Sequence, residues 1–500
     1  MIVTCLSSCF VQHVLANDSD SLNSQVVQYI EDSWDLLTRS HKNWLQSGID
    51  PKLPIQKLII YLPEKENIEL IKSEIASNKS ALIEFKHLPK NYAQIKEHGL
   101  LYLPHPYVVP GGRFNEMYGW DSFFIELGLL ETNRLTLAKN MVDNVLYEIM
   151  NYGMILNANR TYYLGRTQPP FLTQMILAYY EKKPDNAWLQ STLPAINKLY
   201  NHWTSPPHSI PDLGLSRYYA GGQGMTPEES PTYYEKVVRY FKTHSITDYD
   251  KSLFFDEHKN QLTDLFYIAD RTVRESGFDI TAKYGPFGAG ILDYAPVDLN
   301  VLLYKMEQDT QKILNILGQF KAANEWGQRA KHRAITINRY LWDQRAGYYY
   351  DYNFKTKERK IYPFATTFYP LWAGIASREQ AAAVMSHVSD LLVKGGVVTS
   401  INHSGLQWDA PFGWAPMQYF AVLGLQKYGY SRMAVEIAQL FINTVNTGYE
   451  RHHAIFEKYD VKTLSTRTDN KIKYSYTSNE IGFGWTNGVY MAFLKLINQS

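Results

Sequence analysis

The chain has 500 residues, with 50 Lys and Arg against 49 Asp and Glu, which gives a net charge of +1. This balance argues against a nucleic-acid-binding surface and against polybasic attachment to a membrane. Hydrophobic residues at 45% and charged residues at 20% exclude a disordered chain. Aromatic residues reach 14%. Composition alone favours burial of these aromatic residues in a large core, and stacking on sugar rings is the alternative.

The N-terminus predicts export. Ile2–Ala16 is mostly apolar and ends in a small-residue cleavage site at Val14-Leu15-Ala16. No Lys or Arg precedes Arg39, so the basic region usual in secretory signals is missing. We expect residues 1–16 to be a signal peptide and the protein to be periplasmic or secreted. A cytoplasmic protein is the alternative.

Helical periodicity dominates the rest of the chain. Ser21–Trp44 places Val26, Ile30, Trp34 and Leu37 on one stripe. Further helices are predicted, in chain order, at Trp120–Met150, Pro170–Tyr180, Ala187–Trp203, Ala295–Gln311, Glu325–Leu341, Arg378–Leu392, Pro416–Lys427, Ser431–Asn443 and Gly484–Asn498. Strand-like alternation at Gly347–Asn353, with a return at Lys360–Phe364, predicts a β-hairpin.

This pattern predicts an all-α protein. We expect a catalytic domain over residues 101–500, preceded by a helical elaboration over residues 17–100. A helical solenoid is the alternative, but no repeat of fixed period is found. Beyond the N-terminal segment, no run of eighteen apolar residues is present, so no membrane span is expected.

The sequence lacks the motifs that are typical of several classes of enzyme. The sequence has no P-loop and no Gly-x-Ser-x-Gly elbow, and His452-His453 does not fit a His-Glu-x-x-His site. Cys5 and Cys9 are the two cysteines, so the remainder cannot form a zinc-thiolate site or a cysteine nucleophile. We therefore expect no metal and no cofactor. Carboxylates among aromatic residues, arginines and glycine loops favour glycoside hydrolysis, which needs two Asp or Glu side chains.

Polar residues gather in loops that also contain Trp, Gly or Pro. In the first loop, Pro110-Gly111-Gly112 permits a sharp turn, Arg113 supplies donors for hydroxyl groups and Trp120 supplies a stacking face. Each loop alone is more often a solvated connection, but four in one chain favour a binding site. The four loops are Pro110–Asp121, Asn157–Pro170, Arg274–Asp279 and Gln407–Pro416.

Two of these loops carry a family resemblance. Pro110–Asp121 and Gln407–Pro416 resemble the two signature motifs of α,α-trehalases, glycoside hydrolase family 37, with most likeness to the neutral trehalases. The resemblance covers about residues 100 to 495. It implies an (α/α)6 barrel, with short β-hairpins and loops forming the active-site face. It also implies hydrolysis of trehalose to two glucose molecules with inversion.

The resemblance implies roles for particular residues. Asp279, in Glu-Ser-Gly-x-Asp, corresponds to the general acid, and Glu457, in Glu-Lys-Tyr-Asp, corresponds to the general base. Inversion needs carboxyl groups about 6.5–9.5 Å apart, an acid kept protonated by its surroundings and an ionised base. The implied substrate-binding residues are Arg113, Trp120, Asp121, Asn157, Arg166, Gln168, Glu228, Arg274 and Gly277, with Trp408 as a stacking wall.

Other features leave substrate preference open. Lys471–Ile481 replaces the glycine-rich lid of bacterial members, and the position of Glu480 leaves its role open. Another inverting glucosidase, acting on a different small glucoside, and a non-catalytic sugar-binding protein remain alternatives. We expect a monomer that takes a disaccharide and has no nucleic-acid partner.

Overall fold

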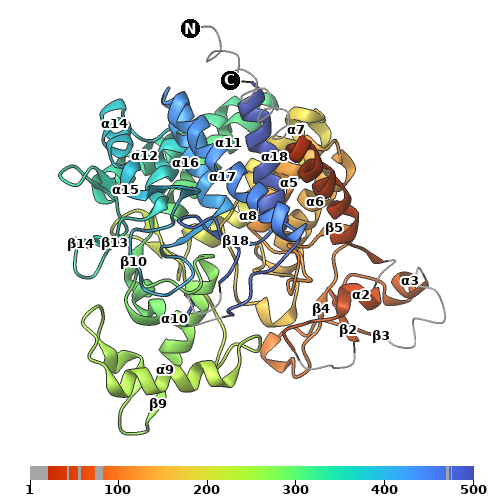
Figure 1. Ribbon diagram of the computed structural model, residues 1–500. Helices are drawn as coiled ribbons and strands as arrows, with labels where there is room; N and C mark the ends of the chain where they lie inside the picture. The colour runs from red at the N-terminus through yellow and green to blue at the C-terminus, as the bar shows by residue number, and fades with distance from the viewer. Residues whose placement is uncertain are drawn as a thin grey trace.

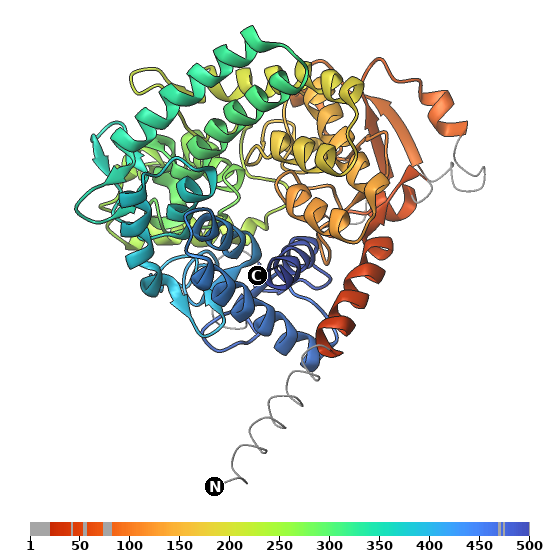
Figure 2. The same cartoon turned by 90° about the horizontal axis from the view of Figure 1, so that it is seen from above.

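An inner ring of helices surrounds the centre of the protein. The computed structural model describes residues 21–41, 44–53, 58–73, 83–468, 472–473 and 476–499. Within the ring each helix contacts the next, and the last closes on the first (Figure 2). In order, the ring consists of α5 (Asp121–Glu131), α7 (Leu172–Lys182), α11 (Val297–Ile316), α13 (Tyr369–Ala373), α16 (Ala415–Lys427) and α18 (Gly484–Asn498).

Outer helices pack against this ring. They include α6 (Leu135–Tyr152) on α5, α8 (Asn186–Thr204) on α7, α12 (Phe320–Tyr340) on α11 and α17 (Ser431–His452) on α16, while α14 (Arg378–Ser386) follows α13. A helix over residues 21–37 brings Trp34 against α5 at Gly128, where Gly488 of α18 also approaches. This double ring confirms the predicted (α/α)6 barrel.

Burial distinguishes the two rings. Nine of the eleven residues of α5 are buried, because an inner helix is covered on nearly all sides. The buried hydrophobic residues of α12 instead form one stripe: Ala323, Trp326, Ala330 and Ile337. That stripe has the spacing of an amphipathic helix with one face in water. The sequence therefore predicted the outer helix α12, although the predicted helix began at Glu325 and the observed helix begins at Phe320.

Some predicted boundaries differ from the structure. The expected helix Trp120–Met150 is divided at Thr132–Arg134 into α5 and α6, with Asn133 in the left-handed region at φ 57°. The chain reverses there from the inner to the outer ring, which apolar periodicity does not reveal. Helices α9 (Pro231–Thr243) and α10 (Asp264–Glu275) were not predicted. A hairpin is present, but its second strand precedes the predicted Lys360–Phe364: β13 (Tyr352–Asn353) pairs with β14 (Glu358–Arg359). The start of the predicted first strand, β12 (Tyr348–Tyr349), pairs instead with β11 (Trp342–Asp343).

The segment before residue 104 contains a small α/β module beside the barrel (Figure 1). Its central strand β2 (Leu58–Leu62) pairs in parallel with β3 (Ile83–His87) and β4 (Leu100–Leu101). Helices α2 (Trp44–Gly48) and α3 (Ile68–Ser73) belong to the same module. Its own apolar cluster is built from Trp44, Ile60, Leu62, Ile71, Ile83, Leu100 and Tyr102. The sequence analysis expected helices here and missed the sheet, whose strands are short.

A short β-ribbon joins two of the sequence motifs. Strand β17 (Phe412–Trp414) pairs antiparallel with β18 (Lys458–Asp460), so that Trp414 faces Lys458. The second signature therefore lies beside Glu-Lys-Tyr-Asp, although more than forty residues separate them in the sequence.

The contact between α5 and α18 depends on glycine. A Cβ added to Gly488 would lie 1.8 Å from the backbone oxygen of Phe124. We expect Gly488→Ala to lower the midpoint of thermal unfolding and to cost about 1–3 kcal/mol through overpacking. Gly327→Ala in α12 is the matched control, because the added Cβ meets the movable side-chain amide of Gln311. Equal midpoints for Gly488→Ala and the wild type would contradict this packing.

Candidate active site

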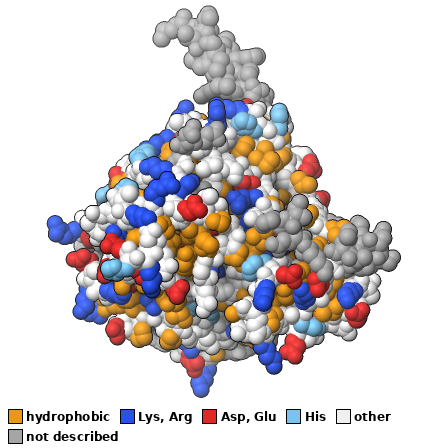
Figure 3. All heavy atoms as spheres, turned by 90° about the horizontal axis from the view of Figure 1, so that it is seen from below, with side chains coloured by type: hydrophobic (Ala, Val, Ile, Leu, Met, Phe, Trp, Pro, Cys, Tyr) orange, Lys and Arg blue, Asp and Glu red, His pale blue; other side chains and the backbone are white. Residues whose placement is uncertain are grey.

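One pocket collects every site residue that the sequence analysis named. Asp279 and Glu457 line it together with the ten predicted binding residues. Loops at one end of the barrel form it, on the side where α10 lies in Figure 1. Figure 3, seen from below Figure 1, shows acidic and basic side chains interspersed over that face. The additional lining residues are Lys52, Pro110, Phe114, Tyr118, Tyr163, Glu229, Gln407, Trp414, Tyr476, Phe483 and Trp485.

The backbone around Asp279 is held by both signature motifs. Gly277 adopts φ +80°, and a Cβ there would lie 3.0 Å from the ring of Trp120, so glycine allows this close approach. The side-chain amide of Gln407 and the indole N–H of Trp408 both donate to the backbone oxygen of Asp279, the latter at 3.1 Å. These contacts fix the backbone that carries the carboxyl group.

The electrostatic surroundings of Asp279 favour its protonated form. Burial among protein atoms raises the pKa of Asp279 to about 7, although Arg274 and Arg166 act in the opposite direction. A carboxyl group with this pKa carries a proton in a large fraction of molecules near neutral pH. That is the property required of a general acid.

Glu457 lies between a lysine and a tyrosine. Lys458 Nζ is 2.6 Å from one carboxylate oxygen, and the hydroxyl of Tyr476 donates to the other. The indole of Trp485 donates to the backbone oxygen of Glu457 at 2.9 Å. Burial raises the pKa of Glu457, and its contacts with Lys458 and Tyr476 oppose that rise by stabilising the carboxylate. The ionised form needed of a base therefore depends on these two neighbours.

Two arginines and two glutamates form a buried charged wall. Arg166 pairs with Glu228, and Arg274 Nη1 lies 2.8 Å from Glu229. Arg274 also contacts Asp270 one turn earlier on α10. Although burial raises it, the positive charges of Arg166 and Arg274 bring the pKa of Glu228 below its usual value. The wall is therefore charged at neutral pH and offers both donors and acceptors to sugar hydroxyl groups.

Tryptophans form the apolar part of the pocket. Trp408 stacks on Trp414 with centroids 4.1 Å apart, and Trp120 meets Trp485 edge to face at 5.7 Å. Trp408 is only 2% exposed and is bound to the backbone of Asp279. Its contacts therefore hold the acid in place, in addition to the stacking wall expected from the sequence.

The remaining predicted residues lie around the acid. Gln168 accepts from the backbone N–H of Trp120 at 2.9 Å, and the side-chain amide of Asn157 donates to the backbone oxygen of Arg274 at 3.4 Å. Asp121 begins α5, and burial raises its pKa well above the usual value. These contacts tie the first signature and the Asn157–Pro170 loop to the end of α10.

The structure gives Glu480 a supporting position. Its carboxylate accepts from the backbone N–H of Arg113 at 2.8 Å, and a Cβ on Gly112 would lie 2.1 Å from it. Glu480 thus shapes the turn that carries Arg113, whose guanidinium lies 5.2 Å from the ring of Tyr476.

Several residues of the site were missed by sequence reasoning. Glu229 lines the pocket and Lys458 contacts Glu457, and each follows a predicted residue directly, so its position carried a signal. Tyr476 was noted in the sequence without a role, and Lys52 had no signal, because it lies outside the family motifs. Within the described ranges, no group of three or more His, Cys, Asp or Glu side chains could hold a metal ion. No helix in those ranges is long and apolar enough to cross a membrane.

Sequence comparison defines the family. The family model described as Trehalase matches residues 9–498, so the chain belongs to the trehalase family. The cytosolic neutral trehalase of Saccharomyces cerevisiae is 36% identical over 491 residues, covering 90% of this chain and 64% of that protein. The cytosolic neutral trehalase of Neurospora crassa is 35% identical over 507 residues, covering 92% and 66%. The chain thus spans slightly less than two thirds of the length of these curated relatives.

Solved structures agree with this membership. The neutral trehalase of Saccharomyces cerevisiae superposes with a TM-score of 0.80 at 33% identity, covering 95% of this chain and 94% of that one. A mannosylglycerate hydrolase from Thermus thermophilus superposes with a TM-score of 0.53 at 17% identity, over 78% of this chain and 96% of that one. The second likeness concerns the fold alone.

The comparisons contradict the predicted signal peptide and periplasmic location. Three relatives that each match 90% or more of this chain are named cytosolic neutral trehalases. Residues 1–16, on which the prediction rested, lie outside the described residues. The prediction gave too much weight to apolar character, since a basic region is missing before Arg39.

Proposed function

We propose that this protein hydrolyses α,α-trehalose to two molecules of glucose with inversion at one anomeric carbon. The observation that carries the proposal is a single pocket in which Asp279, whose pKa burial raises to about 7, and Glu457 both meet a charged wall and a tryptophan cluster. Membership of the trehalase family supports the choice of substrate. Another small glucoside as the preferred substrate would appear as faster glucose release from that sugar.

In the proposed reaction, Asp279 donates its proton to the oxygen between the two sugars as the bond to one anomeric carbon breaks. Glu457 takes a proton from a water molecule, and that water attacks the same carbon from the opposite face. The first glucose leaves with its configuration unchanged, and the second is released as the β-anomer. Arg166, Glu228 and Arg274 supply donors and acceptors for the sugar hydroxyl groups.

The stereochemistry of the products tests this mechanism. Purified protein with trehalose is expected to release α- and β-glucose in equal amounts, because water inverts only the carbon that it attacks. Proton NMR of the anomeric signals, recorded before mutarotation, measures the ratio. Pure α-glucose at the first time point would indicate retention, which requires carboxyl groups about 5–5.5 Å apart and a covalent intermediate. That outcome would overturn the roles proposed for Asp279 and Glu457.

The cellular location and the oligomeric state of the protein are also proposed. The names of the relatives support a cytoplasmic location. One copy of the chain supplies both carboxyl groups and the charged wall, so the proposed reaction does not require a second copy. We propose a monomer that acts on a free disaccharide. Light scattering of the purified protein measures the oligomeric state.

A further inference from the structure

A lysine from outside the barrel reaches the substrate pocket. Lys52 follows α2 and belongs to the α/β module, yet it lines the same pocket as Asp279. Its side chain is only 3% exposed. Lysine is rarely buried unless it is paired, because a buried charge loses its hydration. A buried ammonium group at this position must therefore be stabilised by its neighbours.

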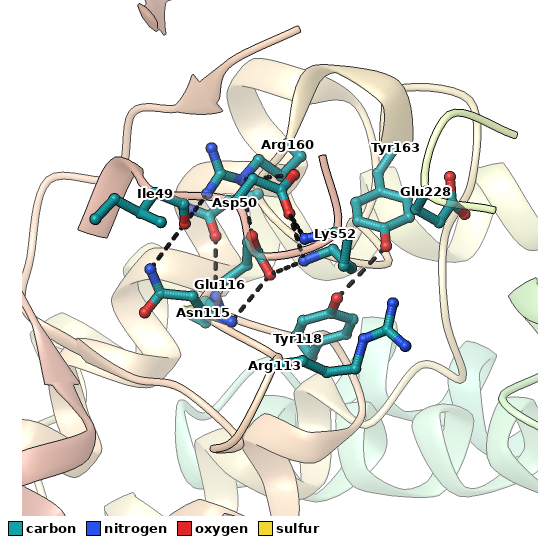
Figure 4. Close-up of polar contacts among 12 residues, drawn as sticks. Ile49, Asp50, Lys52, Arg113, Asn115, Glu116, Tyr118, Arg160, Tyr163 and Glu228 are labelled. Carbon is teal, nitrogen blue, oxygen red and sulfur yellow. Dashed lines mark hydrogen bonds and ion pairs between the residues drawn. The ribbon is translucent and has the colours of Figure 1, made fainter. Parts of the chain in front are cut away.

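The ammonium group of Lys52 is held by two carboxylates. Nζ lies 2.8 Å from Glu116 and 3.0 Å from Asp50 (Figure 4). An ammonium group has three N–H donors, and these two carboxylates account for at most two of them among the described residues. Because Lys52 lines the pocket, this remaining donor is available to a bound molecule there.

The loop that carries Lys52 is anchored without it. Arg160 donates to the backbone oxygens of Gly48 and Ile49 at 2.9 and 2.7 Å, and its Nε donates to Glu116 at 2.8 Å. Asn115 donates to the backbone oxygen of Ile49 at 2.9 Å. Anchoring alone therefore does not account for a second buried cation at this place.

The surroundings of Lys52 suggest which sugar it would contact. Tyr118 and Tyr163 lie beside it in the pocket lining, with their hydroxyl groups 3.4 Å apart (Figure 4). Arg166 covers the ring of Tyr163 at 4.5 Å and also acts electrostatically on Asp279. Lys52, these two tyrosines and Arg166 all line the pocket that holds Asp279. A general acid faces the leaving group, so we expect this part of the lining to contact the glucose that leaves.

We propose that Lys52 is a substrate-positioning residue, which donates a hydrogen bond to a hydroxyl group of the leaving glucose. Asp50, Glu116 and Arg160 hold its ammonium group in place. The inference rests on the proposed function and assigns to the α/β module a direct part in substrate selection. Asn115 and Glu116, within the first signature motif, then serve to hold the module rather than to bind sugar.

Steady-state kinetics with two substrates tests this role. Trehalose has a leaving glucose, whereas α-glucosyl fluoride has only a fluorine atom in its place, which leaves as fluoride. We expect Lys52→Met to raise KM for trehalose by about 10- to 100-fold, the effect of losing a hydrogen bond from a charged donor. With kcat little changed, that pattern indicates lost binding. The kcat/KM for α-glucosyl fluoride is expected to stay within about 2-fold of the wild type, and Lys52→Arg to recover part of the trehalose KM.

Two further variants separate positioning from folding. Asp50→Asn/Lys52→Met removes one charge of each sign, so the buried cluster keeps its net charge, and we expect the same rise in KM for trehalose. Lys86→Met removes an exposed lysine of the same module, which pairs with Glu97 at 2.9 Å, and is expected to behave as the wild type.

The outcomes distinguish this proposal from the proposed function. Wild-type protein that cleaves trehalose, with an unchanged KM in Lys52→Met, would overturn the role of Lys52 alone. Equal losses on both substrates would also overturn it, because they indicate a disturbed pocket. Wild-type protein that neither cleaves trehalose nor binds it by calorimetry would overturn both proposals.

Discussion

Asp279→Asn is expected to lower kcat for trehalose by about 10²–10⁴-fold, the usual contribution of general acid catalysis. The amide keeps the shape of the side chain but cannot donate a proton to the leaving oxygen. α-Glucosyl fluoride should be much less affected, because fluoride leaves with little help from an acid. Asp212→Asn, at an exposed position outside the pocket, is the matched control. Near-normal trehalose turnover in folded Asp279→Asn would contradict the assignment.

The carboxyl group of Asp279 also makes activity and stability depend on pH. The activity of the wild type should fall as the pH rises through about 7, because Asp279 then loses the proton that it must donate. The unfolded chain loses this proton near pH 3.9, so the folded state binds more protons between about pH 4 and 7. Asp279 therefore lowers the free energy of unfolding as the pH rises through that window. The thermal midpoint of Asp279→Asn relative to the wild type should be higher at pH 8 than at pH 5.

Glu457→Gln is expected to lower kcat for trehalose by a similar factor of about 10²–10⁴, because nothing then removes the proton from the attacking water. Azide needs no base to act as a nucleophile. Added azide should therefore restore turnover of α-glucosyl fluoride and give the β-glucosyl azide. The same anion should not restore trehalose cleavage by Asp279→Asn, which lacks the acid. Failure of azide rescue, with fluoride turnover at the wild-type rate, would contradict the role of Glu457.

The stability of Glu457→Gln depends on the lysine that loses its partner, Lys458. That lysine is fully buried, and its ammonium group is 2.6 Å from Glu457. Breaking a buried ion pair by removing one partner costs about 3–5 kcal/mol, so Glu457→Gln should lower the thermal midpoint. Glu457→Gln/Lys458→Met should recover much of that midpoint while remaining inactive. Recovery of stability without activity would separate the chemical role of Glu457 from its structural one.

In its proposed role, Lys52 extends the site beyond the barrel. The family motifs describe a pocket made by barrel loops, whereas Lys52 enters from a separate module with its own apolar cluster. Residues of the first signature then divide into two groups. Arg113, Trp120 and Asp121 line the pocket, and Asn115 and Glu116 hold the module in place.

The amino-acid sequence was sufficient to predict the class of fold and twelve of the residues that line the pocket. Outer helices such as α12 were predicted because one face meets water and the other the core, which produces a periodic stripe. Inner helices lack that contrast, and so the division between α5 and α6 was not visible. Asp279, Glu457 and the predicted binding residues could be named because each lies in a local segment that resembles a motif of the trehalase family.

Only the tertiary structure decided what surrounds those residues. The pKa of Asp279 depends on burial and on Arg166, which lies more than one hundred residues away in the sequence. The contact of Tyr476 with Glu457 and the arrival of Lys52 at the pocket likewise join distant segments. Local residue patterns report which face of an element is buried. The dielectric environment and the long-range pairs arise only when the rings and the module pack together, and these set the charge state of the site.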